Sequence, residues 1–327
     1  MKSVAQARAS VLGAAMLWGT TGTAAALAPS LSAITVGAAA MGLDGILQGI
    51  VNGANVRRST LALGRHAWVV AVGVMCVALY PLAFYSSMRV GGVAVGSVVS
   101  LASAPLASAI IERIVDGRKL TQRWMLASGL GILGGTLLSA AHPGTVGAAH
   151  SSAPGIFLGL LAGCTYAGYS WALRRLMRND VTRGAATGAV LGLGGILLLP
   201  LVVVNGSAIA GSLTTWLVVA YLAVVPMFLG YVLFGIGLGA LDATTATTIT
   251  LIEPAVATVL AVVVLAERTS AAGWTGIALI CGALCLLTVS RRHSAATPTP
   301  HPSGGAVLDP APGTPPVSTD RTDPVTT

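Results

Sequence analysis

The chain has 327 residues, of which 54% are hydrophobic and only 9% are charged, and its formal net charge is +8. A water-soluble domain of this length needs far more solvating charge, so the composition excludes that class. In a membrane protein an excess of basic residues indicates how the chain is oriented in the bilayer, and it gives no support for a nucleic-acid partner.

Two long stretches contain no Asp, Glu, Lys or Arg, one between Arg123 and Arg174 and one between Arg183 and Asp242. A bilayer span needs about 20 mostly apolar residues. Each stretch therefore has room for two spans, separated by a Pro-Gly turn in the first and an Asn-Gly turn in the second.

The apolar segments, taken in chain order, predict an all-α polytopic membrane protein with ten transmembrane helices. Helices are expected because lipid satisfies no backbone polar group, and none of the segments alternates as barrel strands do. Their approximate bounds are 9–28, 33–54, 67–88, 90–112, 121–141, 154–173, 184–204, 214–239, 243–266 and 271–290.

The basic residues predict that both termini are cytoplasmic. With ten spans and the N-terminus inside, every Lys and Arg except Arg89 and Arg268 falls on the cytoplasmic side, as the positive-inside rule requires. As an alternative, the first segment is a signal peptide that is cleaved after Ala28, which would leave nine spans. Pro29 directly after that position disfavours cleavage.

The remaining sequence predicts neither a metal site nor a cofactor site. The four Cys lack metal-type spacing, and the five His lie in predicted loops or near the C-terminus.

Residues 1–8 are expected to form a short cytoplasmic segment and residues 142–153 an external loop. Residues 291–327 are rich in Pro and Thr and predict a disordered cytoplasmic tail.

An internal repeat relates the two halves at an offset of about 149 residues. Pro105 then corresponds to Pro254, and Trp68 falls next to Trp216. The repeats are predicted at 9–141 and 154–290. Each holds five spans, an odd number, so the second half is expected to enter the bilayer inverted. Two inverted five-helix repeats are typical of secondary transporters, whose site lies between the repeats.

Prolines fall inside matching spans of the two halves. Pro81 and Pro226 lie in the third and eighth spans, and Pro105 and Pro254 lie in the fourth and ninth. Proline removes a backbone donor, so helix breaks near a binding site and gating hinges are predicted here. Simple kinks that packing tolerates are the alternative.

Glycines recur at intervals of four residues, for example at Gly45, Gly49 and Gly53. Such faces allow helix backbones to approach closely. Packing within the chain is expected, and a homodimer formed through one of these faces stays open as an alternative.

Several short motifs resemble one transporter family. They are Trp18-Gly19, Ser103-Ala104-Pro105, and Leu251-Ile252-Glu253-Pro254 followed by Leu265-Ala266-Glu267-Arg268. On these the chain resembles the EamA-type family of the drug/metabolite transporter (DMT) superfamily over about residues 9–290. The resemblance implies a carrier of the bacterial cytoplasmic (inner) membrane, often an exporter of amino acids or related metabolites.

The first half departs from this pattern, because Asp116-Gly117-Arg118-Lys119 stands where the second half has Glu-Arg. This departure leaves the substrate open.

Three acidic residues fall within predicted spans, where a charge is costly enough to suggest a function. Glu253 is the first candidate, either as the group that couples transport to protons or as the partner of a substrate amine. A structural acid at a kink is the alternative. Asp44 is the second candidate, with a packing role as its alternative. Glu112 is expected to reach water or to pair with Arg113.

Aromatic residues in several spans predict the walls of a substrate pocket, with interface anchoring or core packing as the alternative. They are Trp18, Tyr80, Tyr85, Tyr166, Tyr169 and Tyr231. The predicted function is secondary active efflux of a small molecule, with protons as the coupling ion. The sequence lacks a phosphate-binding G-x-x-x-x-G-K-[ST] motif, so ATP is not expected to drive it. A lipid-acting membrane enzyme and a membrane-embedded sensor or scaffold are the alternatives.

Overall fold

The computed structural model describes residues 3–91, 93–140, 153–264 and 270–288. Residues 1–289 form one compact unit, and its described secondary structure is entirely helical. Three features expected from the sequence lie outside the described residues: residues 142–152 of the external loop, the Glu267-Arg268 pair and the 291–327 tail.

The helices follow the predicted apolar segments closely. In chain order they are α1 (Val4–Gly19), α2 (Thr21–Ala26), α3 (Ala33–Val51), α4 (Gly53–Arg58), α5 (Thr60–Arg65), α6 (Ala67–Gly91), α7 (Val93–Val115), α8 (Gln122–Ala140), α9 (Ala153–Arg178), α10 (Arg183–Val204), α11 (Gly206–Ile209), α12 (Leu213–Leu222), η1 (Ala223–Leu229), α13 (Gly230–Leu238), α14 (Ala243–Ile249), η2 (Thr250–Ile252), α15 (Glu253–Val264) and α16 (Ala271–Thr288).

Seven of the described helical segments are long and apolar enough to cross a bilayer. They are α3, α6, α7 from Gly96, α9, α10, the α12–η1–α13 stretch and the α14–η2–α15 stretch. The chain is therefore an all-helical, multi-pass membrane protein. The broken α1–α2 segment, α8 and α16 are shorter or less apolar than those seven.

The first two segments differ in detail from the prediction. Helix α1 begins at Val4 rather than at residue 9, because Ser3 and Gln6 form a capping box. It ends at Gly19, and α2 follows after Thr20. Helix α3 ends at Val51, and the short helices α4 and α5 follow it, which the sequence did not predict.

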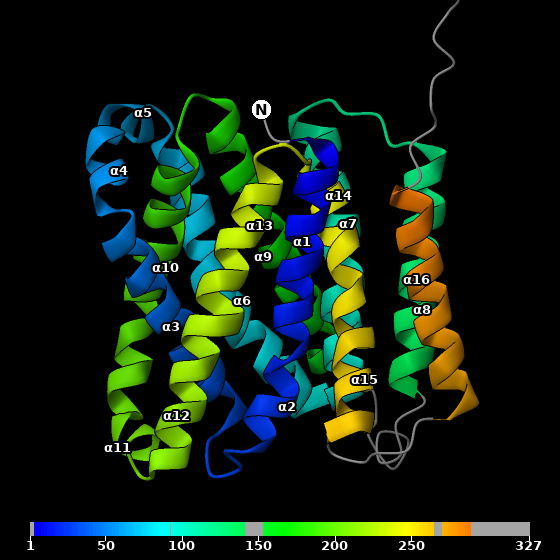
Figure 1. Cartoon of the computed structure of the whole chain (residues 1–327). Helices are drawn as coiled ribbons and strands as arrows, with labels where there is room; N and C mark the ends of the chain where they lie inside the picture. Colours follow the sequence, from blue (N-terminus) through cyan, green and yellow to red (C-terminus); the bar gives the residue numbers. More distant parts are fainter. Residues whose placement is uncertain (1–2, 92, 141–152, 265–269, 289–327) are drawn as a thin grey trace, which may run out of the picture. The chain divides into compact units, whose positions relative to one another are not determined.

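Helices α3 and α10 run side by side in opposite directions (Figure 1). Glycines bring them close: a Cβ at Gly45 would lie 2.7 Å from the Cα of Gly195, and Gly49 faces Gly192. The Gly-rich face predicted around Gly45 therefore packs within the chain.

The two helices also end alike. The side chains of Asn52 and Asn205 each donate a hydrogen bond to the carbonyl four residues earlier, at 3.1 and 2.8 Å.

The prolines break the helices of the second half only. Pro226 lies in η1, a π-helical turn, and Pro254 follows η2, a 3-10 turn. In contrast, α6 and α7 continue as α-helix through Pro81 and Pro105. The expected matching breaks in the first half are therefore not found. One missing hydrogen bond can be accommodated inside a long packed helix without a change of helix type.

Helix α1 packs against both interrupted stretches of the second half, α12–η1–α13 and α14–η2–α15. Conversely, α9 of the second half packs against α6 and α7 of the first half. Helices α8 and α16 pack as a pair (Figure 1). The main buried cluster runs through α1, α9, α10 and α13, and it includes Trp18, Tyr169 and Phe234.

Candidate functional site

A pocket lies where helices from both halves of the chain meet. Helices α1, α2, α3 and α6 line it from the first half, and α9, η1, α13 and α15 line it from the second. The lining residues are Trp18, Thr21, Gly37, Ala40, Met41, Tyr80, Phe84, Tyr85, Tyr166, Tyr169, Met227, Tyr231 and Glu253. A cavity volume of about 50 Å³ holds a few water molecules but is too small for an organic solute. Solute binding therefore requires the walls to move apart.

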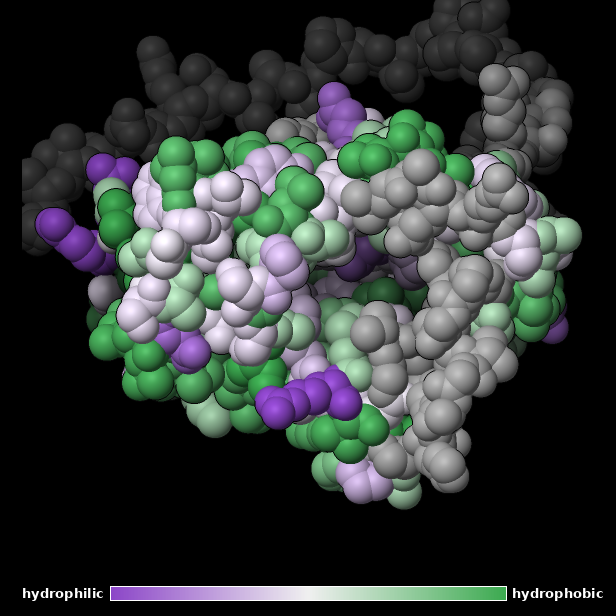
Figure 2. Space-filling view, turned by 90° about the horizontal axis from the view of Figure 1, so that it is seen from below, coloured by the Kyte–Doolittle hydropathy of each residue, from purple (hydrophilic) through white to green (hydrophobic). Residues whose placement is uncertain are grey.

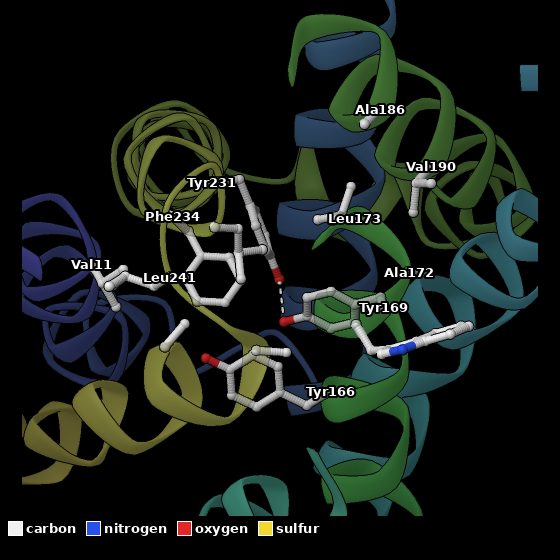
Figure 3. Packing of buried hydrophobic residues seen from close by; sticks show 14 of the residues in the cluster. Val11, Tyr166, Tyr169, Ala172, Leu173, Ala186, Val190, Tyr231, Phe234 and Leu241 are labelled. Carbon is white, nitrogen blue, oxygen red and sulfur yellow. Dashed lines mark hydrogen bonds between the residues drawn. The ribbon is translucent and has the colours of Figure 1, made fainter. Parts of the chain in front are cut away.

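Aromatic side chains form most of the pocket wall. Three of them, Tyr166, Tyr169 and Tyr231, lie close together in Figure 3. Tyr166 and Tyr169 stack with ring centroids 5.3 Å apart on one face of α9. The hydroxyl groups of Tyr169 and Tyr231 lie 3.1 Å apart and share a hydrogen bond. Trp18 lies with its ring centroid 5.3 Å from that of Tyr231. Such rings present apolar area and can attract a cation through their π faces.

Glu253 enters the pocket at a break in the helix. Pro254 lacks the N–H that would bond to the carbonyl of Thr250, and the N–H of Glu253 bonds to that carbonyl instead. This exchange makes η2 a 3-10 turn and places Glu253 at the start of α15. The carboxyl group interacts electrostatically with Tyr80 and Tyr231. Among the described residues, no basic side chain forms an ion pair with it.

Two contacts hold this break in position. The hydroxyl of Tyr166 donates a hydrogen bond of 2.9 Å to Oγ1 of Thr250. On the side of α1, a Cβ at Gly19 would lie 2.7 Å from the side chain of Val256 and 3.1 Å from the carbonyl oxygen of Glu253. Glycine at this position therefore lets α1 pack on the break, which gives the Trp18-Gly19 motif a structural reason.

Most of the residues predicted for the site come together in this pocket. Trp18, Tyr80, Tyr166, Tyr169 and Glu253 all line it. Their contact with a transported solute stays a prediction.

Asp44 is buried inside the bundle, with 1% of its surface exposed. It lies on α3 one turn beyond the pocket residue Met41 and is not among the lining residues.

The four prolines lie at different distances from the pocket. Pro81, Pro226 and Pro254 are neighbours in sequence of the lining residues Tyr80, Met227 and Glu253. Pro105 is buried in α7 and adjoins no lining residue in sequence. Their role in gating stays a prediction.

Sequence reasoning missed six lining residues: Thr21, Gly37, Ala40, Met41, Phe84 and Met227. Helical spacing offered a signal for two of them, because Phe84 lies one turn after Tyr80 and Met41 lies one turn before Asp44. Thr21 and Met227 lie at the helix breaks, where that spacing does not apply.

A group of charged residues, here called the ion cluster (Asp116, Arg118, Arg174, Arg175 and Asp242), joins the two halves at the end of the unit where α1 begins. Arg118 pairs with Asp242, and Nη2 of Arg174 lies 3.8 Å from the same carboxylate. Nη1 of Arg175 donates a hydrogen bond of 2.6 Å to Asp116. The Asp116 and Arg118 side chains therefore connect the α7–α8 loop to α9 and to the start of α14.

Glu112 strengthens this connection in a way that the sequence did not predict. It is 4% exposed and accepts a hydrogen bond of 2.8 Å from the N–H of Ala243. Its second oxygen accepts one from the hydroxyl of Thr244. The expectation that Glu112 reaches water or pairs with Arg113 was wrong, because the free N–H groups at the start of α14 compete for this carboxylate.

The opposite end of the unit is hollowed. Figure 2 shows this end, and a depression near its centre has hydrophilic residues at its base. The ion cluster therefore lies at one end of the helices and the hollow at the other.

The fold and the pocket define a multi-pass membrane protein with a pocket between its two halves. The model of the EamA-like transporter family matches the chain twice, at residues 8–140 and 153–289. The chain therefore belongs to the EamA-like transporter family, within the DMT superfamily, and is a transporter rather than an enzyme. Membership implies a small-molecule substrate and a membrane location.

Two individual proteins extend this comparison. The chain is 29% identical over 302 residues to the "Uncharacterized transporter YwfM" of Bacillus subtilis (strain 168), covering 90% of this chain and 97% of that protein. A solved structure described as "Crystal structure of protein" superimposes with a TM-score of 0.71 at 22% identity. It covers 88% of this chain and 97% of its own, and it supports the fold alone.

Proposed function

We propose that this protein is a proton-coupled secondary transporter that exports an amino acid or a related amine or drug-like compound by alternating access. The observation that carries the proposal is the position of Glu253, a carboxyl group in an aromatic pocket where the two halves meet. A carboxyl group there can bind either a proton or a positively charged substrate. Competition between these two ligands for one group couples their movements.

The chemistry of the pocket favours an amine. A carboxylate and the π faces of tyrosine and tryptophan both attract an ammonium group, whereas none of the described residues that line the pocket has a basic side chain. The methionine and aromatic side chains accommodate an apolar substituent. Protonation of Glu253 would weaken the attraction and release the substrate.

The proposed topology is ten spans in two inverted five-helix repeats. The α1–α2 segment, α8 and α16 would join the seven long spans. Matching contacts support this arrangement: α9 packs on α6 and α7, and α1 packs on the corresponding segments of the second half. Antiparallel α3 and α10 occupy equivalent positions and end in equivalent asparagines. The basic residues support a bacterial cytoplasmic membrane location with both termini in the cytoplasm.

In this topology the ion cluster lies at the cytoplasmic end and forms the closed inner gate. The hollow in Figure 2 then lies on the outer side. Opening of the inner gate would require the arginines to leave Asp242 and Asp116. The two breaks at η1 and η2 would serve as hinges, since both adjoin pocket residues.

Transport in proteoliposomes tests this proposal. The vesicles are loaded with pooled amino acids and small amines, a pH gradient is imposed, and proton flux is followed with a fluorescent reporter. Wild type should show flux that depends on the pool, and splitting the pool should identify the substrate. Glu253→Gln should insert normally and lose the flux.

Two outcomes would contradict the proposal. Normal pH-driven transport by Glu253→Gln would exclude Glu253 as the coupling group. Pool-dependent exchange of labelled solute that moves no protons in wild type would exclude coupling to protons.

A further inference from the structure

Four polar side chains continue the pocket-lining face of α3 toward the end of the unit where α1 begins. They are Asp44, Gln48, Asn52 and Asn55, here called the polar stripe. They follow one another at intervals of three or four residues, so they lie along one side of α3 and α4. The pocket residues Gly37 and Met41 precede them on the same side.

Hydrogen bonds connect the amides of the stripe. Nδ2 of Asn52 donates to Oε1 of Gln48 at 3.3 Å, and Nδ2 of Asn55 donates to Oδ1 of Asn52 at 3.4 Å. Asp44 and Gln48 are buried, whereas Asn52 and Asn55 are half-buried. The stripe therefore leads from the middle of α3 to residues that reach the surface.

The inner end of the stripe holds an acid with an unused acceptor. Among the described residues, Oδ1 of Asp44 has no hydrogen-bond partner, although it is buried. No described basic side chain forms an ion pair with Asp44. A buried carboxylate without a cation is costly, and binding a proton removes that cost.

The helices packed around Asp44 carry few groups that could balance the negative charge of its carboxylate in place of a proton. Tyr231 of α13 interacts electrostatically with Asp44 and also with Glu253 of α15 and Tyr85 of α6. Helix α10 packs against α3 through glycines, which include Gly192. On the side of η1, Nε2 of Gln48 donates a hydrogen bond of 3.3 Å to the carbonyl of Phe228. This bond fixes Gln48 between Asp44 and the outer amides.

We propose that Asp44 is a second proton-binding site, and that the polar stripe connects it with water at the end of the unit where α1 begins. The amides would hold a chain of water molecules. The water next to Asp44 would give a proton to Oδ1 as one of its own O–H bonds breaks, and it would take a proton from the next water in the chain. The waters are thereby restored, and the net transfer is of one proton from hydronium in the bulk solvent to the carboxylate. This inference rests on the proposed proton coupling. It gives protons a route at that end that does not pass through the ion cluster, while Glu253 is reached from the pocket.

Infrared spectroscopy of the full-length protein in lipid, without any substrate, tests the inference. The carbonyl band of protonated Asp44 is defined by its loss in Asp44→Asn, and that of Glu253 by its loss in Glu253→Gln. On transfer to D₂O, the rate at which each band shifts reports how readily water reaches the group. Gln48→Leu should slow the shift of the Asp44 band several-fold and leave that of the Glu253 band unchanged.

Asn205→Leu is the matched control, because Asn205 makes the equivalent helix-end hydrogen bond outside the stripe. Both bands should exchange at the wild-type rate in this variant. If Gln48→Leu does not fold, Asn52→Leu replaces it.

Absence of an Asp44 band at every pH would overturn the inference, and so would equal exchange rates in wild type and the stripe variants. The infrared assay needs no transported solute. A negative result there would therefore count against the Asp44 site and can be distinguished from a negative result in the transport assay, which would count against the proposed function.

Discussion

The N–H of Ala243 donates a hydrogen bond to the carboxylate of Glu112 at 2.8 Å, so an acid at the end of α7 caps the start of α14. These residues are far apart in sequence and belong to different halves of the chain. The contact fixes the start of the broken span beside the loop that carries Asp116 and Arg118, and thereby supports the ion cluster.

Removal of this cap should destabilise the protein. Glu112→Ala leaves buried N–H groups at the start of α14 without their acceptor, and we expect a loss of about 1–3 kcal/mol in the free energy of unfolding. Glu112→Gln keeps an acceptor oxygen and should lose less. Unfolding in detergent, followed by circular dichroism, measures both. Equal losses in the two variants would show that the charge, rather than the cap, supplies the stability.

The tyrosine pair in the pocket should behave as one unit. Tyr169→Phe leaves the buried hydroxyl of Tyr231 without its partner, which should cost about 1–3 kcal/mol of unfolding free energy. Tyr231→Phe should cost a similar amount, and the double variant should cost less than the sum. Denaturant titration of the three variants gives the coupling energy.

Tyr221→Phe serves as the control for the pair. Its hydroxyl pairs with that of Thr20 at an exposed position, so the expected change is within about 0.5 kcal/mol. Additive losses at Tyr169 and Tyr231 would contradict the predicted coupling.

A methyl group at Gly37 should disturb the proposed substrate pocket. The Cβ of Gly37→Ala would overlap the ring of Tyr85, so the ring must leave its position in the wall. We expect the affinity for the transported solute to fall roughly tenfold, which corresponds to about 1.4 kcal/mol. Gly282→Ala in α16 meets no atom within 4 Å and should bind as wild type does. Competition binding in detergent compares the two variants, and equal affinities would exclude Tyr85 from the binding wall.

Loss of the central acid of the ion cluster should open the pocket at that end. Asp242→Asn removes the charge that Arg118 and Arg174 share. In a variant whose four native cysteines are replaced, Met41→Cys places a thiol in the pocket. A membrane-impermeant maleimide, applied from the side where α1 begins, should label this thiol faster when Asp242→Asn is present.

Asp180→Asn is the control for this experiment, because Asp180 is exposed at the connection between α9 and α10 and lies outside the ion cluster. It should leave the labelling rate unchanged. If Asp242→Asn also left the rate unchanged, the cluster would not be a gate.

The sequence alone determined the class of the protein and the course of its main helices. Long apolar segments in lipid must satisfy their own backbone hydrogen bonds, so hydropathy predicts them directly. Hence segments such as 67–88 and 184–204 correspond closely to α6 and α10. The cost of a charge within a span likewise identified Glu253 as a candidate before any contact was known.

The tertiary structure decided which faces of these helices meet. Composition does not distinguish a lipid-facing Asp44 from one that is buried in the bundle, because the difference depends on how α3 packs on α10 and η1. The hydrogen bond between Glu112 and Ala243 could not be predicted for the same reason, because the two residues lie in different halves of the chain. The proline positions did not predict that α-helical structure would be interrupted only in the second half. Each proline removes one backbone hydrogen bond, and the packing around the helix decides whether the helix then continues or forms a turn of another type.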